Sequence, residues 1–212
     1  MSDEAFVHIV EQVGSYYGGK LREHGITPRG VDWNSVESQT MRFDQLLKVC
    51  DTDAPFTLTD FGCGYGALFD HLAARHTAFT YTGFDVSKEM TTAARELHAD
   101  DPRCRFVEDR DAVPASDYCV ASGVLNVKMT IPSAEWERYV LAVIESLNAL
   151  GRRGFAFNAL TKYSDADRMR DDLHYADPHA LFDHCRRYSR QVALLHDYPL
   201  YEFSIIVRKP EG

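Results

Sequence analysis

The sequence lacks the features of an exported or membrane-spanning protein. Its 212 residues include five cysteines, an odd number without a Cys-x-x-Cys pair, which argues against a disulfide framework and against a zinc ribbon. The longest aliphatic stretch, Val140 to Ile144, is far too short to span a bilayer. The first four residues, Met1-Ser2-Asp3-Glu4, are acidic where a signal peptide carries positive charge. We therefore expect a cytoplasmic protein with reduced thiols and no membrane contact.

Positive charge is also scarce. The chain has 23 Lys and Arg against 32 Asp and Glu, a formal net charge of −9. Such a surface repels a phosphate backbone, so a nucleic-acid partner would need a local basic patch. The only basic clusters are short: Arg152-Arg153, Arg186-Arg187 with Arg190, and Arg208-Lys209. They are typical of solvated helix ends, and we do not expect a nucleic-acid partner.

The apolar content is that of one globular domain. Hydrophobic residues make up 45% of the chain, with no repeat or low-complexity tract. We expect residues 1–212 to form a single domain, with 1–53 as an N-terminal helical cover and 54–212 as an α/β core. In the cover, Phe6 to Tyr17 has helical spacing that Gly18-Gly19 is predicted to stop, and Asn34 with Glu37 forms a capping-box pattern.

Predicted strands and helices alternate along the core. The predicted strands are 56–61, 79–85, 103–108, 118–122, 154–159, 192–196 and 201–207. The predicted helices are 67–75, 87–98, one from Ser133 to Gly151, and one from Asp177-Pro178 to about Tyr188. This alternation predicts an α/β fold: a doubly wound, seven-stranded, mostly parallel sheet with an antiparallel last strand and helices on both faces. Ligands bind such sheets beyond the carboxyl ends of the strands.

A glycine-rich turn follows the first of these strands. The segment Asp60-Phe61-Gly62-Cys63-Gly64-Tyr65-Gly66 leads from the strand into a helix. Its glycines allow positive φ and close approach of a ligand, and the helix N-terminus supplies free N–H groups. Asp85 ends the next predicted strand, where a carboxylate can accept hydrogen bonds from both hydroxyls of a ribose. Together these features predict an adenosine-containing cofactor.

The turn alone leaves the choice of cofactor open. Gly62, Gly64 and Ala67 also fit the loose G-x-G-x-x-A pattern of dinucleotide sites. An acid before the glycines, Asp60, opposes that reading because a carboxylate repels a pyrophosphate and attracts the ammonium of a methionine. Asp109 after the third strand and the closing hairpin oppose it as well.

From residue 34 to 209 the sequence resembles the class I S-adenosylmethionine-dependent methyltransferases, which have a Rossmann-like fold. The resemblance implies that S-adenosylmethionine is the cofactor and that S-adenosylhomocysteine is the product. It assigns the methionine end to Asp60, Gly62, Gly64, Gly66 and a backbone carbonyl at Ser122, the ribose to Asp85 with Val86 beside it, and the adenine to Asp109 with Arg110.

Each assignment has a purely structural alternative. The glycine turn could serve packing, Asp85 could cap the helix that begins near Ser87, and Asp109 could be a solvated loop acid.

Two segments are candidates for the rest of the site. The first contains Tyr16, Tyr17, Trp33, Gln39 and Arg42. There Arg42 is predicted to pair with the methionine carboxylate, or else to be a surface arginine, and the two tyrosines could shield the sulfonium or pack within the helix.

The second segment runs from Leu160 to Asp177. It contains His174, our candidate general base, with Tyr175 beside it, although an ordinary loop histidine would fit the sequence too. Asn126, just past the fourth strand, is predicted to contact the acceptor. No metal is expected, because His174, His179 and His184 are spaced so that their rings do not share a helix face.

The sequence thus predicts an S-adenosylmethionine-dependent methyltransferase that acts on a small molecule. The alternatives are an RNA or protein methyltransferase, or a protein that binds the cofactor without turnover. The segment after the fourth strand lacks the Asn-Pro-Pro-aromatic run of nucleobase-amino methyltransferases, which argues against a nucleic-acid substrate. Neither the acceptor nor the oligomeric state follows from the residues.

Overall fold

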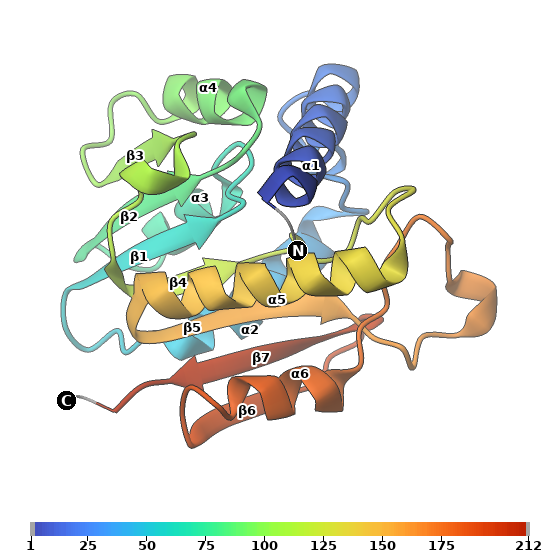
Figure 1. Ribbon diagram of the computed structural model, residues 1–212. Coiled ribbons are helices and arrows are strands. Elements are labelled where there is room, and N and C mark those ends of the chain that lie inside the picture. Colours follow the sequence, from blue (N-terminus) through green and yellow to red (C-terminus); the bar gives the residue numbers. More distant parts are fainter. Residues whose placement is uncertain (1–2, 211–212) are drawn as a thin grey trace.

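A computed structural model describes residues 3–210 and shows one central sheet with helices on both faces (Figure 1). The sheet has seven strands in the order β3-β2-β1-β4-β5-β7-β6. The strands are β1 Phe56–Phe61, β2 Phe79–Phe84, β3 Cys104–Val107, β4 Ser116–Ala121, β5 Gly151–Leu160, β6 Gln191–Leu195 and β7 Glu202–Arg208. Only β7 is antiparallel to its neighbours, which confirms the predicted fold class.

Within residues 3–210, six α-helices surround the sheet. They are α1 Asp3–His24, α2 Val36–Leu46, α3 Ala67–Ala73, α4 Lys88–Leu97, α5 Ser133–Leu150 and α6 Pro178–Cys185. Short 3-10 turns are η1 Pro28–Val31, η2 Leu47–Val49, η3 Arg110–Ala112 and η4 Ala166–Arg168. In the part of the chain that the structure describes, no helix is both long enough and apolar enough to cross a membrane.

Each face of the sheet has its own apolar core, as expected for parallel strands buried on both sides. Side chains of α1, α5 and α6 pack on one face, where Trp136 of α5 is fully buried. Side chains of α2, α3 and α4 pack on the other, around Leu58 of β1 and Leu72 of α3. The strand order reverses between β1 and β4, and this switch point is where open α/β sheets bind ligands.

The predicted end of the first helix is wrong. Helix α1 continues through Gly18-Gly19 to His24, and Gly25 follows with φ 65°. At Gly18 the helix α1 lies close to α4, because a Cβ there would lie 3.0 Å from the carboxyl group of Glu89. Gly18 thus lies within the helix at a close contact with a neighbouring helix and is not a stop signal.

The predicted start of α2 is also wrong by one residue. Ser35, and not Asn34, has the extended backbone of an N-cap, and its Oγ accepts a hydrogen bond from the Ser38 N–H at 3.2 Å. At α5 the predicted cap Ser133 is the first helical residue, after Pro132. At α6 the prediction is confirmed, since Asp177 caps the helix and Pro178 begins it.

Candidate active site

The glycine turn joins β1 to α3 with its glycines in the left-handed region. Gly62 has φ 84° and Gly64 has φ 54°. A Cβ at Gly62 would lie 2.3 Å from Val124 Cγ2, and one at Gly64 would lie 2.8 Å from Val31 Cγ1. Any side chain would therefore strain the backbone and collide with residues that enclose the turn.

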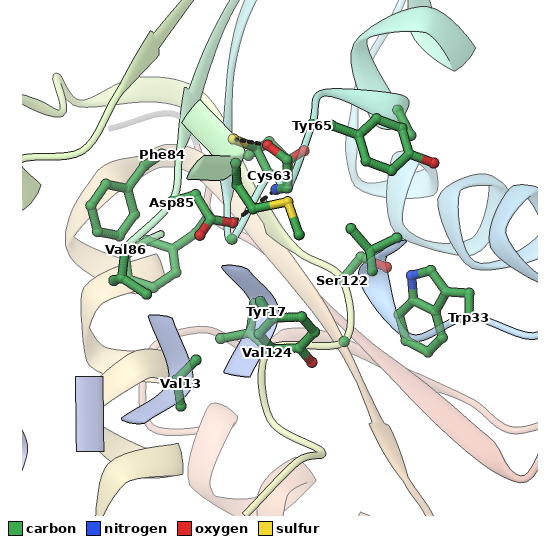
Figure 2. A pocket seen from close by; sticks show the side chains of 18 of the residues that line it. Val13, Tyr17, Trp33, Cys63, Tyr65, Phe84, Asp85, Val86, Ser122 and Val124 are labelled. Atoms are coloured by element: carbon green, nitrogen blue, oxygen red, sulfur yellow. Dashed lines mark hydrogen bonds between the residues drawn. The ribbon is translucent and has the colours of Figure 1, made fainter. Parts of the chain in front are cut away.

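Asp85 directly follows β2, and its side chain is hydrogen-bonded to the glycine turn that follows β1 (Figure 2). Its Oδ2 accepts a hydrogen bond from the Gly64 N–H at 2.8 Å, and its Oδ1 accepts one from the Ser87 N–H at 2.9 Å. The N-cap of α4 is Ser87 itself, whose Oγ accepts from Met90 N. Burial raises the pKa of Asp85 to about 6, against the opposing effect of these two hydrogen bonds.

Asp60 lies beside it near the end of β1, in register with Gly83 of β2. Its Oδ2 accepts a hydrogen bond from the Tyr81 hydroxyl at 2.6 Å. Burial, with a smaller contribution from the charge of Asp85, raises the pKa of Asp60 to about 7. Its Oδ1 and the Ser122 Oγ are buried and have no hydrogen-bond partner among residues 3–210. Both residues line the pocket described next, so its wall holds polar atoms that a ligand can satisfy.

A pocket lies at this end of the sheet, with about 760 Å³ of empty space when the part open to solvent is included. Figure 2 shows its side chains converging from the N-terminal segment and from the strand ends. The strand ends and the turn contribute Asp60, Phe61, Gly62, Cys63, Gly64, Tyr65, Phe84, Asp85, Val86, Ser122, Gly123 and Val124. The helices and the N-terminal segment contribute Val13, Tyr17, Val31, Trp33, Gln39, Phe43, Ala67, Met90 and Tyr139.

The N-terminal segment forms one wall of the pocket. Val13 and Tyr17 reach it from α1, and Val31 and Trp33 reach it from η1 and the residues after it. The Trp33 ring lies against Gly123, where a Cβ would come within 2.3 Å of Trp33 Cζ2. The pocket is thus closed on one side by residues that precede the sheet in sequence.

Comparisons with known proteins agree with this geometry. Residues 59–152 match a family described as a methyltransferase domain. The protein named "Putative methyltransferase Rv1506c", from Mycobacterium tuberculosis, is 54% identical over 168 residues, which are 77% of this chain and 99% of that protein. The chain belongs to the class I S-adenosylmethionine-dependent methyltransferases.

Solved structures share the fold of the methyltransferase at low sequence identity. The DhpI complex with S-adenosylhomocysteine has a TM-score of 0.62 and 15% identity, over 96% of this chain and 98% of that one. Magnesium protoporphyrin IX methyltransferase from Synechocystis, also with S-adenosylhomocysteine bound, has a TM-score of 0.59 and 16% identity, over 82% and 84%.

Several residues predicted for the cofactor lie outside the lining of the methyltransferase pocket. Gly66 has φ 92° and is the N-cap of α3. Asp109 is exposed, and its Oδ1 accepts a hydrogen bond from the Asp111 N–H at 2.9 Å, so it caps η3. The Arg110 guanidinium lies 5.8 Å from the centre of the Phe61 ring. The adenine role of Asp109 and Arg110 stays a prediction.

Arg42 is not a surface arginine. It is buried on α2, its Nη2 pairs with Glu202, and its guanidinium stacks on the Trp33 ring at 3.8 Å. Arg42 is not among the pocket-lining residues, although its Nε and Nη1 have no partner within the described part of the chain. Its pairing with the methionine carboxylate therefore stays a prediction.

The residues predicted for catalysis lie outside the pocket lining, and two of them, Asn126 and His174, are hydrogen-bonded to each other. The Asn126 carbonyl accepts a hydrogen bond from the His174 N–H at 2.7 Å, and its Oδ1 accepts one from the Leu160 N–H at 3.0 Å. The Tyr175 hydroxyl accepts from the Arg170 N–H at 2.9 Å. Burial lowers the pKa of His174, so its imidazole is neutral near pH 7. The catalytic roles of these residues stay predictions.

Sequence reasoning missed Val124, Tyr139 and Asn158. Tyr139 gave no signal because it continues the apolar face of α5, and Val124 gave none because it lies in a loop. Asn158 did carry a signal, since it is a polar residue inside the apolar strand Phe155-Ala156-Phe157-Asn158-Ala159.

Across residues 3–210, no three His, Cys, Asp or Glu side chains are arranged to hold a metal ion.

Proposed function

We propose that this methyltransferase holds S-adenosylmethionine in the pocket and methylates a small-molecule acceptor there. The residues fit the cofactor because the positive-φ glycines leave room for a ligand at the turn, and Asp60 Oδ1 and Ser122 Oγ offer unsatisfied polar atoms. When bound, the cofactor supplies an electrophilic methyl group on a sulfonium. The side chains around it have to position the reactants and exclude water.

The cofactor's orientation follows from the chemistry of the wall. Asp85 is the carboxylate that can accept hydrogen bonds from ribose hydroxyls, with Val86 and Phe84 as apolar neighbours for the adenine. Asp60 and the Ser122–Gly123 turn then face the methionine end. A carboxylate there attracts the methionine ammonium.

The enclosure of the pocket is the observation that favours a small acceptor. Tyr17, Val31 and Trp33 cover one side, so an acceptor has to enter a cavity and not lie across a surface. The net charge of −9 opposes a polyanion. The Synechocystis relative is named for magnesium protoporphyrin IX, a small molecule.

Positioning and exclusion of water can supply much of the rate enhancement, because methyl transfer from a sulfonium is an in-line displacement with a good leaving group. The covering aromatic residues would exclude water. For an acceptor that must lose a proton, His174 is the candidate base, since burial keeps it neutral and able to accept.

The test is a substrate screen with isotope-labelled S-adenosylmethionine. The protein is incubated with fractionated cell extract in three arms: small metabolites, RNA and protein. We expect label to enter the metabolite arm with wild type and not with Asp85→Ala. Label confined to RNA or protein would contradict the proposal, and so would the absence of label in every arm.

A further inference from the structure

A chain of buried hydrogen bonds leads from the pocket wall into the sheet. The Gly123 N–H donates to Asn158 Oδ1 at 2.8 Å, and Asn158 Nδ2 donates to Glu202 Oε2. Glu202 Oε1 accepts from Arg42 Nη2. The chain thus connects the end of β4 with β5, β7 and α2.

The same chain returns to its starting point through an aromatic contact. The Arg42 guanidinium stacks on the Trp33 ring at 3.8 Å, and the Trp33 ring lies against Gly123. Gly123, Asn158, Glu202, Arg42 and Trp33 therefore form a closed circuit, which we call the Glu202 circuit. Two of its members, Gly123 and Trp33, line the pocket on adjoining walls (Figure 2 shows Trp33 beside Ser122).

The centre of the Glu202 circuit is deeply buried. Glu202 is 1% exposed and Asn158 is fully buried. A buried ion pair is a weak source of stability, because removing both charges from water costs as much as their attraction returns. Buried polar networks of this kind can instead specify one arrangement of the groups they join.

We propose that Glu202 is a positioning residue for the methionine end of the cofactor. One carboxylate oxygen holds Gly123 through Asn158, and the other holds Trp33 through Arg42. The proposal rests on the cofactor orientation given above. It assigns Glu202 no contact with the ligand, since it is absent from the pocket lining.

The adenosine end of the pocket has separate supports. Asp85 is held by the N–H groups of Gly64 and Ser87, and none of these residues belongs to the Glu202 circuit. A disturbance of Glu202 should therefore weaken ligands that have a methionine or homocysteine tail. It should spare adenosine, which lacks that tail.

The chain offers a matched exchange to test this. In Glu202→Gln, an amide replaces one of the two accepting oxygens and Arg42 loses its counter-charge. In Asn158→Asp, two carboxylates face each other. The double variant Asn158→Asp/Glu202→Gln keeps every hydrogen bond of the circuit. Its carboxylate at position 158 accepts from the Gly123 N–H and from the side-chain amide at position 202, whose oxygen accepts from Arg42. The negative charge only moves from position 202 to position 158.

Titration calorimetry with S-adenosylhomocysteine and with adenosine gives the readout. We expect each single variant to bind S-adenosylhomocysteine about tenfold more weakly, the scale of one lost charge-assisted hydrogen bond, with adenosine binding unchanged. The double variant should recover wild-type affinity to within about threefold. If a single variant does not fold, Glu202→Asp, which keeps the charge but is too short to reach both partners, takes its place.

Three results would overturn the proposal: unchanged S-adenosylhomocysteine binding in the single variants, equal loss of both ligands, or no recovery in the double variant. Failure of the cofactor orientation would be seen separately. In that case Asp85→Ala would retain adenosine affinity, whatever the Glu202 variants do.

Discussion

At the scale of single residues, the site contains two buried carboxyl groups, and burial of a charged carboxylate costs free energy of folding. Asp60 and Asp85 are buried at neighbouring strand ends, and burial raises the pKa of both. One is held by a tyrosine hydroxyl and the other by two backbone N–H groups. Perturbed carboxyl groups that line a pocket are typical of functional sites.

Asp85→Ala should weaken S-adenosylmethionine binding by at least about tenfold. The substitution removes the acceptor for the ribose hydroxyls and the anchor of the Gly64 N–H. Asp109→Ala is a separate test of the predicted adenine role, because Asp109 is exposed and lies outside the pocket lining. Titration calorimetry measures both. Wild-type affinity in Asp85→Ala would remove the ribose assignment, and a large loss in Asp109→Ala would support the adenine role predicted from sequence.

The ligand-free protein should lose stability between about pH 4 and pH 7 because of Asp60. Its pKa is about 7 when folded and about 3.9 when unfolded, so the unfolded chain binds fewer protons in this range. The stabilising contribution is complete below about pH 4 and is lost as the pH rises through about 7. Asp60→Asn, which keeps an acceptor for Tyr81, should have a smaller decline in its free energy of unfolding, measured with urea at several pH values. Parallel curves for the two proteins would contradict this.

At the scale of helices and strands, the sequence predicted what local patterns encode. The turn at Gly62–Gly66 and the cap at Asp177 are local, and both lie where the residues indicated. The end of α1 was missed because Gly18-Gly19 is locally a stop signal, whereas in the structure Gly18 lies within the helix and faces Glu89, which is distant in sequence. The Glu202 circuit could not be predicted for the same reason, since its contacts join residues as far apart as Arg42 and Glu202.

Ser35→Ala should destabilise the protein by about 1 kcal/mol, the usual cost of a lost N-cap. Its side chain caps α2, the helix that carries Gln39 and Arg42. Asn34→Ala is the control and should change the free energy of unfolding by less than about 0.5 kcal/mol, because Asn34 is not the cap. Urea unfolding of both variants measures the difference. A larger effect at Asn34 than at Ser35 would mean that Asn34 is the N-cap, as the sequence predicted.

At the scale of the whole molecule, the N-terminal segment and the outer edge strand β6 lie in different places. The N-terminal α1 and η1 reach the pocket at the carboxyl ends of the strands, while the C-terminal β6 forms the far edge of the sheet (Figure 1). A ligand that fills the pocket would contact α1, the glycine turn and the residues after β4. Binding should therefore join the N-terminal cover to the sheet without affecting that edge.

Hydrogen exchange with and without saturating S-adenosylhomocysteine tests this division. We expect slower exchange in the glycine turn at residues 62–66 and in residues 28–33, because the ligand fills the space between them and opposes local opening. Exchange in β6 should change only as far as global stability does. Asp85→Ala at the same ligand concentration is the control and should show little protection. Protection spread evenly over the chain would mean that the ligand acts only through global stability, and the N-terminal segment would then not be a cover for the site.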